Sequence, residues 1–204
     1  MIPKRITSVE PGYPGWTFNY EYSGQLLTKM YEVGGVTITF SYNSNNKLQS
    51  MIASDGTETQ NTTATYSSGN MTQLHTTSSD GGSANEKFYY NSLGQVNKYE
   101  LYINGSLAET HFYVYDAIGN VIKDTENGVA RYITVDNKNH PFKNVITQPE
   151  DGFIGNPWFG NLYNNYLSVD EYTFTYQYDS DNFPVKRVYR NGSGTIVQTD
   201  TFEY

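Results

Sequence analysis

Cysteine is absent from this chain of 204 residues, and both charged residues and long apolar runs are scarce. The lack of cysteine excludes disulfides, thiolate catalysis and cysteine-based zinc sites. No run of residues approaches the apolar length that a helix needs to span a bilayer, so we expect no transmembrane span in this chain. Only 17% of the residues are charged, and the formal net charge is −8. Because neutralisation of phosphates dominates affinity for nucleic acids, an acidic chain without Lys/Arg clusters is expected to have no nucleic-acid partner.

Aromatic residues supply much of the apolar surface, with 20 Tyr, 10 Phe and 2 Trp. Thr, Ser, Asn and Gly dominate the remainder. Aromatic and β-branched residues favour strands, and Asn and Gly favour turns. The composition therefore predicts an all-β fold. The length suits a single domain over residues 1–204.

A short phrase recurs along the chain and is spelled most fully as YVYDAIGNVIKD, residues 113–124. An aromatic residue is followed by Asp or Asn, then by spacer residues, Gly or Asn, and an apolar residue. The aromatic positions are Tyr22, Tyr42, Tyr66, Tyr90, Tyr115 and Tyr178, and Val135 takes the aromatic's place in one phrase. From Tyr22 to Val135, successive positions lie 20 to 25 residues apart, and this spacing is typical of repeat architectures. We expect the aromatic to end a strand on its buried face, Asp or Asn to cap the turn, and Gly or Asn to adopt a positive φ.

A second kind of turn alternates with this phrase. It is spelled Gly34-Gly35, Asp55-Gly56, Asp80-Gly81-Gly82, Asn104-Gly105, Asn127-Gly128 and Asn191-Gly192. Asn-Gly and Asp-Gly suit type I′ hairpin turns, so each repeat is a pair of strands. Residues 36–42 show the period of two that is typical of a sheet with one face in water. We predict an antiparallel meander of about seven hairpin repeats, about fourteen strands, forming a rolled sheet that is barrel-like or a half-pipe.

The interval from Val135 to Tyr178 is longer than the others and contains an aromatic loop insertion at 148–168. Insertions in repeat proteins often form the binding face. The ligand-binding candidates are Asn156, Trp158, Phe159, Asn161, Tyr163 and Tyr166. The insertion is interpreted either as a plug that seals one end of the rolled sheet or as an exposed platform that stacks on sugar rings. We favour the plug, with Trp158 and Phe159 packed and residues 161–165 facing solvent.

Metal and catalytic chemistry find little support. His75, His111 and His140 lie in three different repeats without ligand spacing, so we expect no metal and no cofactor. Asp179, Asp181 and Asn182 resemble part of a calcium loop, but Phe183 and Pro184 stand where that loop needs Gly, so we expect turn capping. Glu150 and Asp151 are the best candidates for a carboxylate pair that hydrolyses glycosides. We expect these acidic residues to serve solubility instead.

The phrase Tyr-Asp-x-x-Gly-x-Val resembles the YD repeat of the RHS class of bacterial surface and secreted proteins. Tyr115, Asp116, Gly119 and Val121 match it, and a second phrase at residues 90–96 matches with Asn for Asp. The order of VDNKNHPFKN, YNNYL and YQYDSDNFPVKRV is similar to small repeat lipoproteins of Gram-negative bacteria whose function is unknown. The resemblance implies export to the bacterial envelope or surface, as an outer-membrane lipoprotein whose lipidated Cys precedes residue 1. It implies no known reaction.

These observations favour a non-catalytic exported envelope module that binds or scaffolds, with a glycan as the expected ligand class. Its partners would be polysaccharide or another envelope protein. Two alternatives stay open, a carboxylate-based polysaccharide hydrolase and a purely structural spacer. A deep cleft with two facing carboxylates would favour the hydrolase, an aromatic shelf would favour binding, and a surface with neither would favour the spacer.

Overall fold

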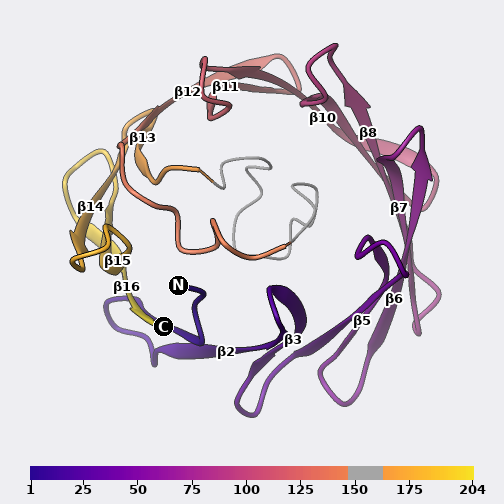
Figure 1. The fold of residues 1–204 in the computed structure, drawn as a ribbon, viewed down its shortest axis with the longest axis horizontal. Helices are drawn as coiled ribbons and strands as arrows, with labels where there is room; N and C mark the ends of the chain where they lie inside the picture. Colours follow the sequence, from indigo (N-terminus) through magenta and orange to yellow (C-terminus); the bar gives the residue numbers. More distant parts are fainter. Residues whose placement is uncertain (147–162) are drawn as a thin grey trace.

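The computed structural model describes residues 1–146 and 163–204, and within them the chain forms sixteen antiparallel strands that close into a barrel (Figure 1). Each strand pairs with the next in chain order, and β16 returns to pair with β1. The strands are β1 (Arg5–Val9), β2 (Trp16–Ser23), β3 (Leu26–Glu32), β4 (Thr37–Tyr42), β5 (Leu48–Ser54), β6 (Thr59–Ser67), β7 (Asn70–Ser78), β8 (Ser83–Tyr90), β9 (Val96–Ile103), β10 (Ser106–Tyr115), β11 (Val121–Glu126), β12 (Val129–Val135), β13 (Tyr166–Val169), β14 (Tyr172–Tyr178), β15 (Pro184–Arg190) and β16 (Ile196–Glu203). The all-β antiparallel meander is confirmed, and the rolled sheet closes fully.

The strand number exceeds the expected fourteen, and one added strand corrects the extent of the insertion. β13 occupies Tyr166–Val169, and its first three residues lie in the stretch 148–168 that was predicted to be a loop insertion. This strand has four residues, too few for its alternation to stand out in the sequence. Its pairing with β12, through partners such as Ile133 and Val169, makes it a strand. Among the described residues, no helix is long and apolar enough to cross a membrane.

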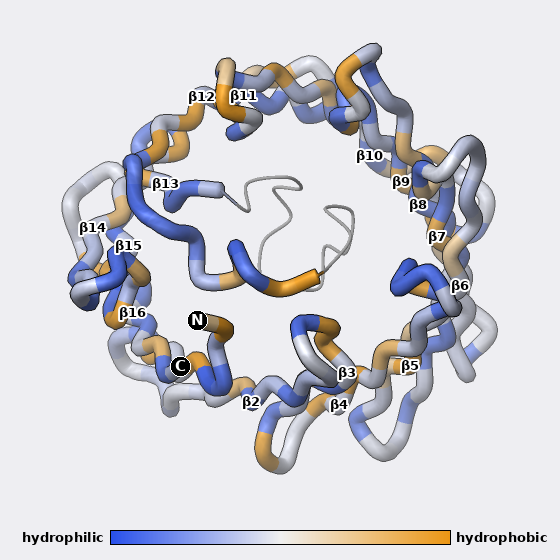
Figure 2. The backbone as a smooth tube through the Cα atoms, viewed as in Figure 1, coloured by the Kyte–Doolittle hydropathy of each residue, from blue (hydrophilic) through white to orange (hydrophobic). Residues whose placement is uncertain are grey.

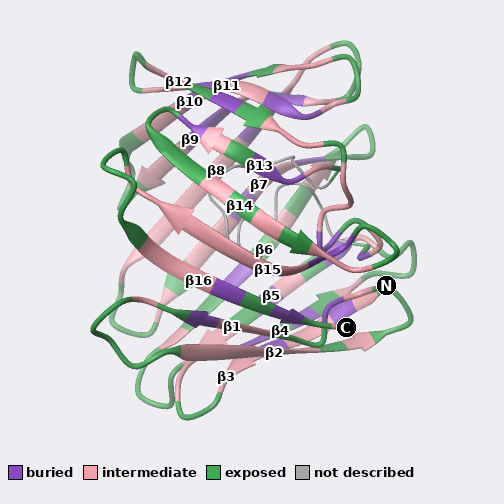
Figure 3. Cartoon of the chain, turned by 90° about the vertical axis from the view of Figure 1, so that its left-hand side faces the viewer, coloured by how far each residue is buried: buried purple, intermediate pink, exposed green. Residues whose placement is uncertain are grey.

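The two faces of the wall differ in polarity, as the period of two predicts. One row of cross-strand neighbours on the outward face of β4 to β8 is polar throughout, reading Ser41, Ser50, Thr63, His75 and Asn85. The inward positions of the same strands hold buried apolar side chains, such as Phe40, Met51, Leu74 and Phe88. Figure 2 shows how hydrophobic and hydrophilic positions alternate along the wall, and Figure 3 shows exposed turns at both ends. The core therefore lies inside the barrel.

The aromatic of each repeated phrase lies at a β-bulge. The pairing register shifts just before Tyr22, Tyr42, Tyr66, Tyr90, Tyr115, Val135 and Tyr178. The hydroxyls of Tyr42, Tyr66, Tyr90 and Tyr115 donate to the carbonyl oxygens of Leu27, Leu48, Met71 and Val96, each in the preceding hairpin, at 2.5 to 2.9 Å. These four tyrosines thus each join one hairpin to the hairpin before it. This explains why the phrase uses Tyr rather than Phe.

Tyr90→Phe should therefore lower the free energy of unfolding by about 0.5 to 1.5 kcal/mol, because the carbonyl of Met71 loses its side-chain donor. Tyr22→Phe is the matched control, since the buried Tyr22 hydroxyl has no hydrogen-bond partner among the described residues. Denaturant unfolding of both variants tests the idea. Equal losses in the two variants would show that the hydroxyl bond is unimportant.

The turn chemistry follows the sequence closely. In the phrase that begins at Tyr115, Asp116 Oδ1 accepts the backbone N–H groups of Ile118, Gly119 and Asn120, and Gly119 has a φ of 107°. Asp179 Oδ1 likewise accepts the N–H groups of Asp181 and Phe183, so turn capping at this acidic cluster is confirmed.

The type I′ conformation predicted for the hairpin turns is found at some positions and not at others. Positive φ at both central residues of Asn104-Gly105 and Asn127-Gly128 confirms type I′ turns there. The other four turns do not belong to that class. In the turns at residues 34–35, 55–56 and 80–82 a single glycine has positive φ, and in the turn at 191–195 Asn191 is the cap and Gly194 takes the positive φ. Ser68-Gly69, which the sequence analysis placed inside a repeated phrase, has positive φ at both residues.

The phrase built on Val135 does not continue into a hairpin, and this corrects the repeat alignment. Residues 136–146, here called the inner segment, run inside the barrel instead (Figure 1). Phe142 is 3% exposed and packs edge-on against Tyr20 of the wall, with 5.4 Å between ring centroids. Ile146 donates its N–H to the carbonyl of Gln25. The inner segment therefore fills the end of the barrel where the repeated turns lie.

Candidate functional site

The structure describes two of the six ligand-binding candidates from the sequence, and it places them in different environments. Tyr166 is 5% exposed and belongs to the core, where its ring lies 6.4 Å from that of Phe174. Tyr163 is 49% exposed and lies against the turn at Gly119. Asn156, Trp158, Phe159 and Asn161 lie outside the described residues, as do Glu150 and Asp151. Because Tyr166 is buried, it cannot belong to an exposed aromatic platform that stacks on sugar rings.

The expectation that residues 161–165 face solvent holds for Tyr163 but is wrong for Asn165, and Asn164 is only partly exposed. Asn165 is 2% exposed, and its side chain donates to Asp136 Oδ2 at 3.1 Å. Asn164 Oδ1 accepts a hydrogen bond from Asn120, which is fully buried. Both amides are used to join the end of the insertion to neighbouring turns. Amide-rich composition suggested solvent, whereas the structure buries these amides with partners.

The three histidines lie apart, as their positions in the repeats suggested. His75 is on the outer face and hydrogen-bonds Asn85 across the β7–β8 pair. His140 belongs to the inner segment, where burial and the charge of Arg187 lower its pKa to about 3. His111 lies on the inner face of β10 and is 7% exposed. Only His111 is surrounded by carboxylates.

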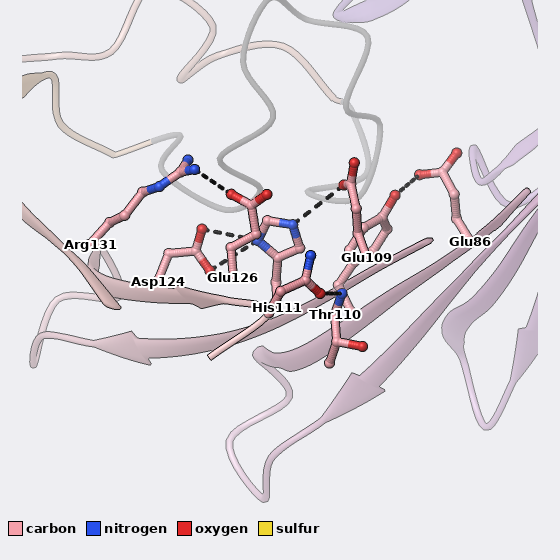
Figure 4. Close-up of polar contacts among 9 residues, drawn as sticks. Glu86, Glu109, Thr110, His111, Asp124, Glu126 and Arg131 are labelled. Carbon is pink, nitrogen blue, oxygen red and sulfur yellow. Dashed lines mark hydrogen bonds and ion pairs between the residues drawn. The ribbon is translucent and has the colours of Figure 1, made fainter. Parts of the chain in front are cut away.

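A polar cluster surrounds His111 on the inner face of β8 to β12 (Figure 4). The two oxygens of Asp124, which is fully buried, lie 3.0 Å from His111 Nδ1, and Glu109 lies 3.5 Å from Nε2. The cross-strand register places Asp124 between Tyr113 and Arg131. Arg131 forms a 2.5 Å ion pair with Glu126. Charged groups of both signs are therefore concentrated on one part of the inner wall.

The cluster changes the protonation of His111. Burial lowers the pKa of His111, but the hydrogen bond and charge of Asp124, with Glu126 and Glu109, outweigh it. The net result is a pKa above the ordinary histidine value, so the imidazolium form is favoured. In the same cluster, burial raises the pKa of Glu86, although a hydrogen bond from Tyr99 opposes this shift.

His111→Gln should reduce stability more under mildly acidic than under alkaline conditions. The pKa of His111 is raised on folding, so its contribution is fully present below the unfolded value of about 6.5 and is lost as the pH rises through the folded value. We expect the difference in unfolding free energy between wild type and variant to shrink with rising pH. Denaturant unfolding across this pH range measures it, with His75→Gln as the surface control. A difference that is independent of pH would contradict the assignment.

An aromatic pocket of about 450 Å³ adjoins this cluster at the hairpin-turn end of β12 to β15. It is lined by Arg131, Val169, Asp170, Glu171, Tyr172, Phe174 and Tyr189. Phe174 and Tyr189 stack with 4.8 Å between centroids and 7° between ring planes, and Tyr172 lies 5.5 Å from Tyr189. Arg131 belongs to both the pocket and the His111 cluster. The pocket offers aromatic faces together with a cation and carboxylates.

Sequence reasoning missed this pocket. The alternation in residues 172–178 correctly marked an inward aromatic face, and it was interpreted as core alone. The available clues were Arg131, on a strand whose other inward residues are apolar, and Glu171, in the turn between β13 and β14. Pairing of β12 with β13 and of β14 with β15 brings these residues together, and that pairing is not visible in composition.

Comparisons with known proteins place the fold. No protein-family model matches the chain, and no curated protein matches its sequence. Among solved structures, the chain is similar to a porin-like protein from Bacteroides uniformis, with 14% identity, a TM-score of 0.66, and coverage of 98% of this chain and 97% of that one. It is also similar to a porin-like protein from Bacteroides vulgatus, with 12% identity, a TM-score of 0.53, and coverage of 100% and 98%. The closed antiparallel barrel is thus a fold that this chain shares with Bacteroides porin-like proteins.

Proposed function

We propose that this protein is a non-catalytic envelope module that binds a saccharide in the aromatic pocket at the hairpin-turn end of the barrel. The observation that carries this proposal is the stack of Phe174 on Tyr189 beside Tyr172, bordered by Arg131 and Glu171. Sugar rings present apolar C–H faces to aromatic rings and hydroxyls to charged groups. A pocket that combines the two suits such a ligand.

The carboxylates of the pocket support binding rather than hydrolysis. Asp170 Oδ1 accepts the N–H of Tyr132 at 2.8 Å, and Asp170 has a φ of 50°, so this side chain holds its turn. Glycosidases need two carboxyl groups that are free to act on the scissile bond. With Asp170 committed to the turn, the pocket itself supplies Glu171 for contact with a ligand. We therefore propose saccharide binding rather than glycoside hydrolysis as the function of the pocket.

The envelope location rests on two supports. The YD-type phrases resemble those of RHS-like surface proteins and small repeat lipoproteins, and the fold is shared with Bacteroides porin-like proteins. The outward row from Ser41 to Asn85 on β4 to β8 is polar, whereas a membrane-spanning barrel carries an apolar band around its outside. We propose that the wall faces water and that the attachment to the envelope is a lipid anchor outside these strands.

Tyr189→Ala should weaken saccharide binding at least tenfold, about 1.4 kcal/mol, because it removes one of the two stacked rings. Titration calorimetry with a panel of neutral and charged oligosaccharides measures the affinity, and thermal melts check that the variant is folded. Tyr13→Ala is the control, since Tyr13 is 70% exposed in the β1–β2 turn. Equal affinity in the two variants, or no ligand in the panel, would contradict the proposal. Release of reducing sugar would establish the hydrolase instead.

A further inference from the structure

The outward face of β8 to β12 differs from the polar wall elsewhere. Tyr89, Phe112 and Tyr132 are 41%, 50% and 63% exposed on it, and Val114 is 48% exposed. Three lysines stand among these side chains, namely Lys87, Lys98 and Lys123. We call the set of Lys87, Tyr89, Lys98, Phe112, Lys123 and Tyr132 the lysine–aromatic strip. Exposed aromatic side chains gathered on one face commonly mark an interaction site.

The strand register sets the order of the strip. Tyr89 of β8, Lys98 of β9 and Phe112 of β10 are consecutive cross-strand neighbours. In the next outward row, Val114 of β10, Lys123 of β11 and Tyr132 of β12 are neighbours. Tyr89 and Phe112 are two strands apart, and so are Val114 and Tyr132. At about 4.8 Å per strand, the rings of Tyr89 and Phe112 stand about 10 Å apart, roughly the length of two pyranose units.

Each lysine of the strip lies over an aromatic ring. Lys98 Nζ is 4.9 Å from the ring centroid of Tyr89 and 5.8 Å from that of Phe112. Lys123 Nζ is 5.7 Å from the ring of Tyr132, and Lys87 Nζ is 4.4 Å from the ring of Tyr102. These contacts hold Lys98 and Lys123 beside exposed rings of the strip, whereas Lys87 is held beside the half-buried ring of Tyr102 on β9.

The charge of the strip opposes that of the whole chain. Glu100 lies beside the strip, as the cross-strand neighbour of Lys87, and forms a 2.6 Å ion pair with Lys98. Lys87 and Lys123 remain as cationic groups, so the strip is net positive in a chain of net charge −8. Cores of protein interfaces are depleted in lysine, whereas here lysines separate the rings. An anionic ligand with repeating apolar faces suits this arrangement better than a protein surface does.

We propose that the lysine–aromatic strip binds an acidic polysaccharide, one that carries carboxylate or sulfate groups. The chain would lie across the strands, with sugar faces on Tyr89, Phe112 and Tyr132 and its anionic groups beside Lys87 and Lys123. This surface is on the outer wall, whereas the saccharide pocket is inside the barrel. The proposal therefore does not depend on the function proposed for the pocket.

Affinity electrophoresis in gels that contain polygalacturonate, dextran sulfate or neutral dextran tests this at about 50 mM salt, where screening is modest. We expect the two acidic polymers to retard the wild-type protein, neutral dextran to have no effect, and added salt to reduce the retardation. Comparison of polygalacturonate with dextran sulfate separates carboxylate from sulfate recognition. Absence of retardation by either acidic polymer, or equal retardation by neutral dextran, would overturn the proposal.

Two strip variants, Lys87→Gln/Lys123→Gln and Phe112→Ala/Tyr132→Ala, should each weaken retention at least tenfold. Lys29→Gln/Tyr31→Ala is the matched control, because Lys29 lies 4.5 Å from the Tyr31 ring on β3, away from the strip. Tyr189→Ala should leave retention unchanged, which separates this surface from the pocket. Unchanged retention in both strip variants would overturn the proposal. So would a wild-type dimer in sedimentation velocity that Phe112→Ala/Tyr132→Ala dissociates, since the strip would then be a contact between two copies.

Discussion

Removal of residues 185–204 is expected to abolish cooperative unfolding of the whole barrel. The deletion takes away β16 and nearly all of β15, and these strands connect β14 to β1. Their loss leaves β1 and β14 as unpaired edges and exposes the core on both sides. Because the sheet encloses a single core, the remaining strands should lose fixed packing together. Near-ultraviolet circular dichroism and thermal melts of the truncated chain measure this.

A truncated chain that melts almost normally would contradict this expectation and indicate independently stable repeats. A circular permutant is the matched control, because it keeps every strand. Lys4 and Glu203 are joined by a 2.7 Å backbone hydrogen bond, so a flexible linker between residues 204 and 1 is compatible with the closed barrel. New ends between Asn104 and Gly105, in an exposed two-residue turn, should then preserve the cooperative transition.

Asp200→Ala is expected to lower the free energy of unfolding by about 3 to 5 kcal/mol. Asp200 is fully buried on β16. Its carboxylate accepts hydrogen bonds from Arg187 Nε, Ser8 Oγ and Gln198 Nε2, each at 2.6 Å. The Arg187 side chain is 26% exposed, so removal of the carboxylate leaves a partly buried charge without its ion-pair partner. Ser8 belongs to β1, so the same carboxylate also joins the two ends of the chain. Denaturant unfolding measures the loss.

The double variant Arg187→Met/Asp200→Leu tests the cause. Replacement of both charged groups by apolar side chains removes the unpaired charge, so stability should return toward that of the wild type. A double variant that is as unstable as Asp200→Ala would show that packing around the carboxylate matters more than the charge of Arg187.

Local patterns in the sequence were enough to predict a meander of hairpins and the positions of most turns. A period of two sets which side chains share a face, and it holds for Ile38 and Phe40, both buried on the inner side of β4. Asp116 and Gly119 act within one turn, through contacts that span four residues or fewer. Such features depend on the nearest neighbours in the chain, so residue type and spacing determine them.

The hydrogen bonds made by the repeated tyrosines could be identified only from the strand register of the sheet. The sequence marked Tyr90 and Tyr115 as strand ends, but their hydroxyl bonds reach back 19 residues to Met71 and Val96. Which carbonyl lies within reach depends on the register of β7 to β10 and on the bulges that shift it. Spacing along the chain does not contain that register.

Closure of the barrel, the course of the inner segment and the candidate site were decided by tertiary structure alone. The sequence alone determined an all-β meander of hairpins and left its closure open. Pairing of β1 with β16 joins residues almost 200 positions apart, and the hydrogen bond from Ser8 to Asp200 is one of the contacts between them. The pocket likewise combines Arg131 with Tyr189, from strands that are not neighbours in the chain. The physical reason is that the curvature of the sheet and the burial of one shared core select these long-range partners, whereas local patterns select only the strands.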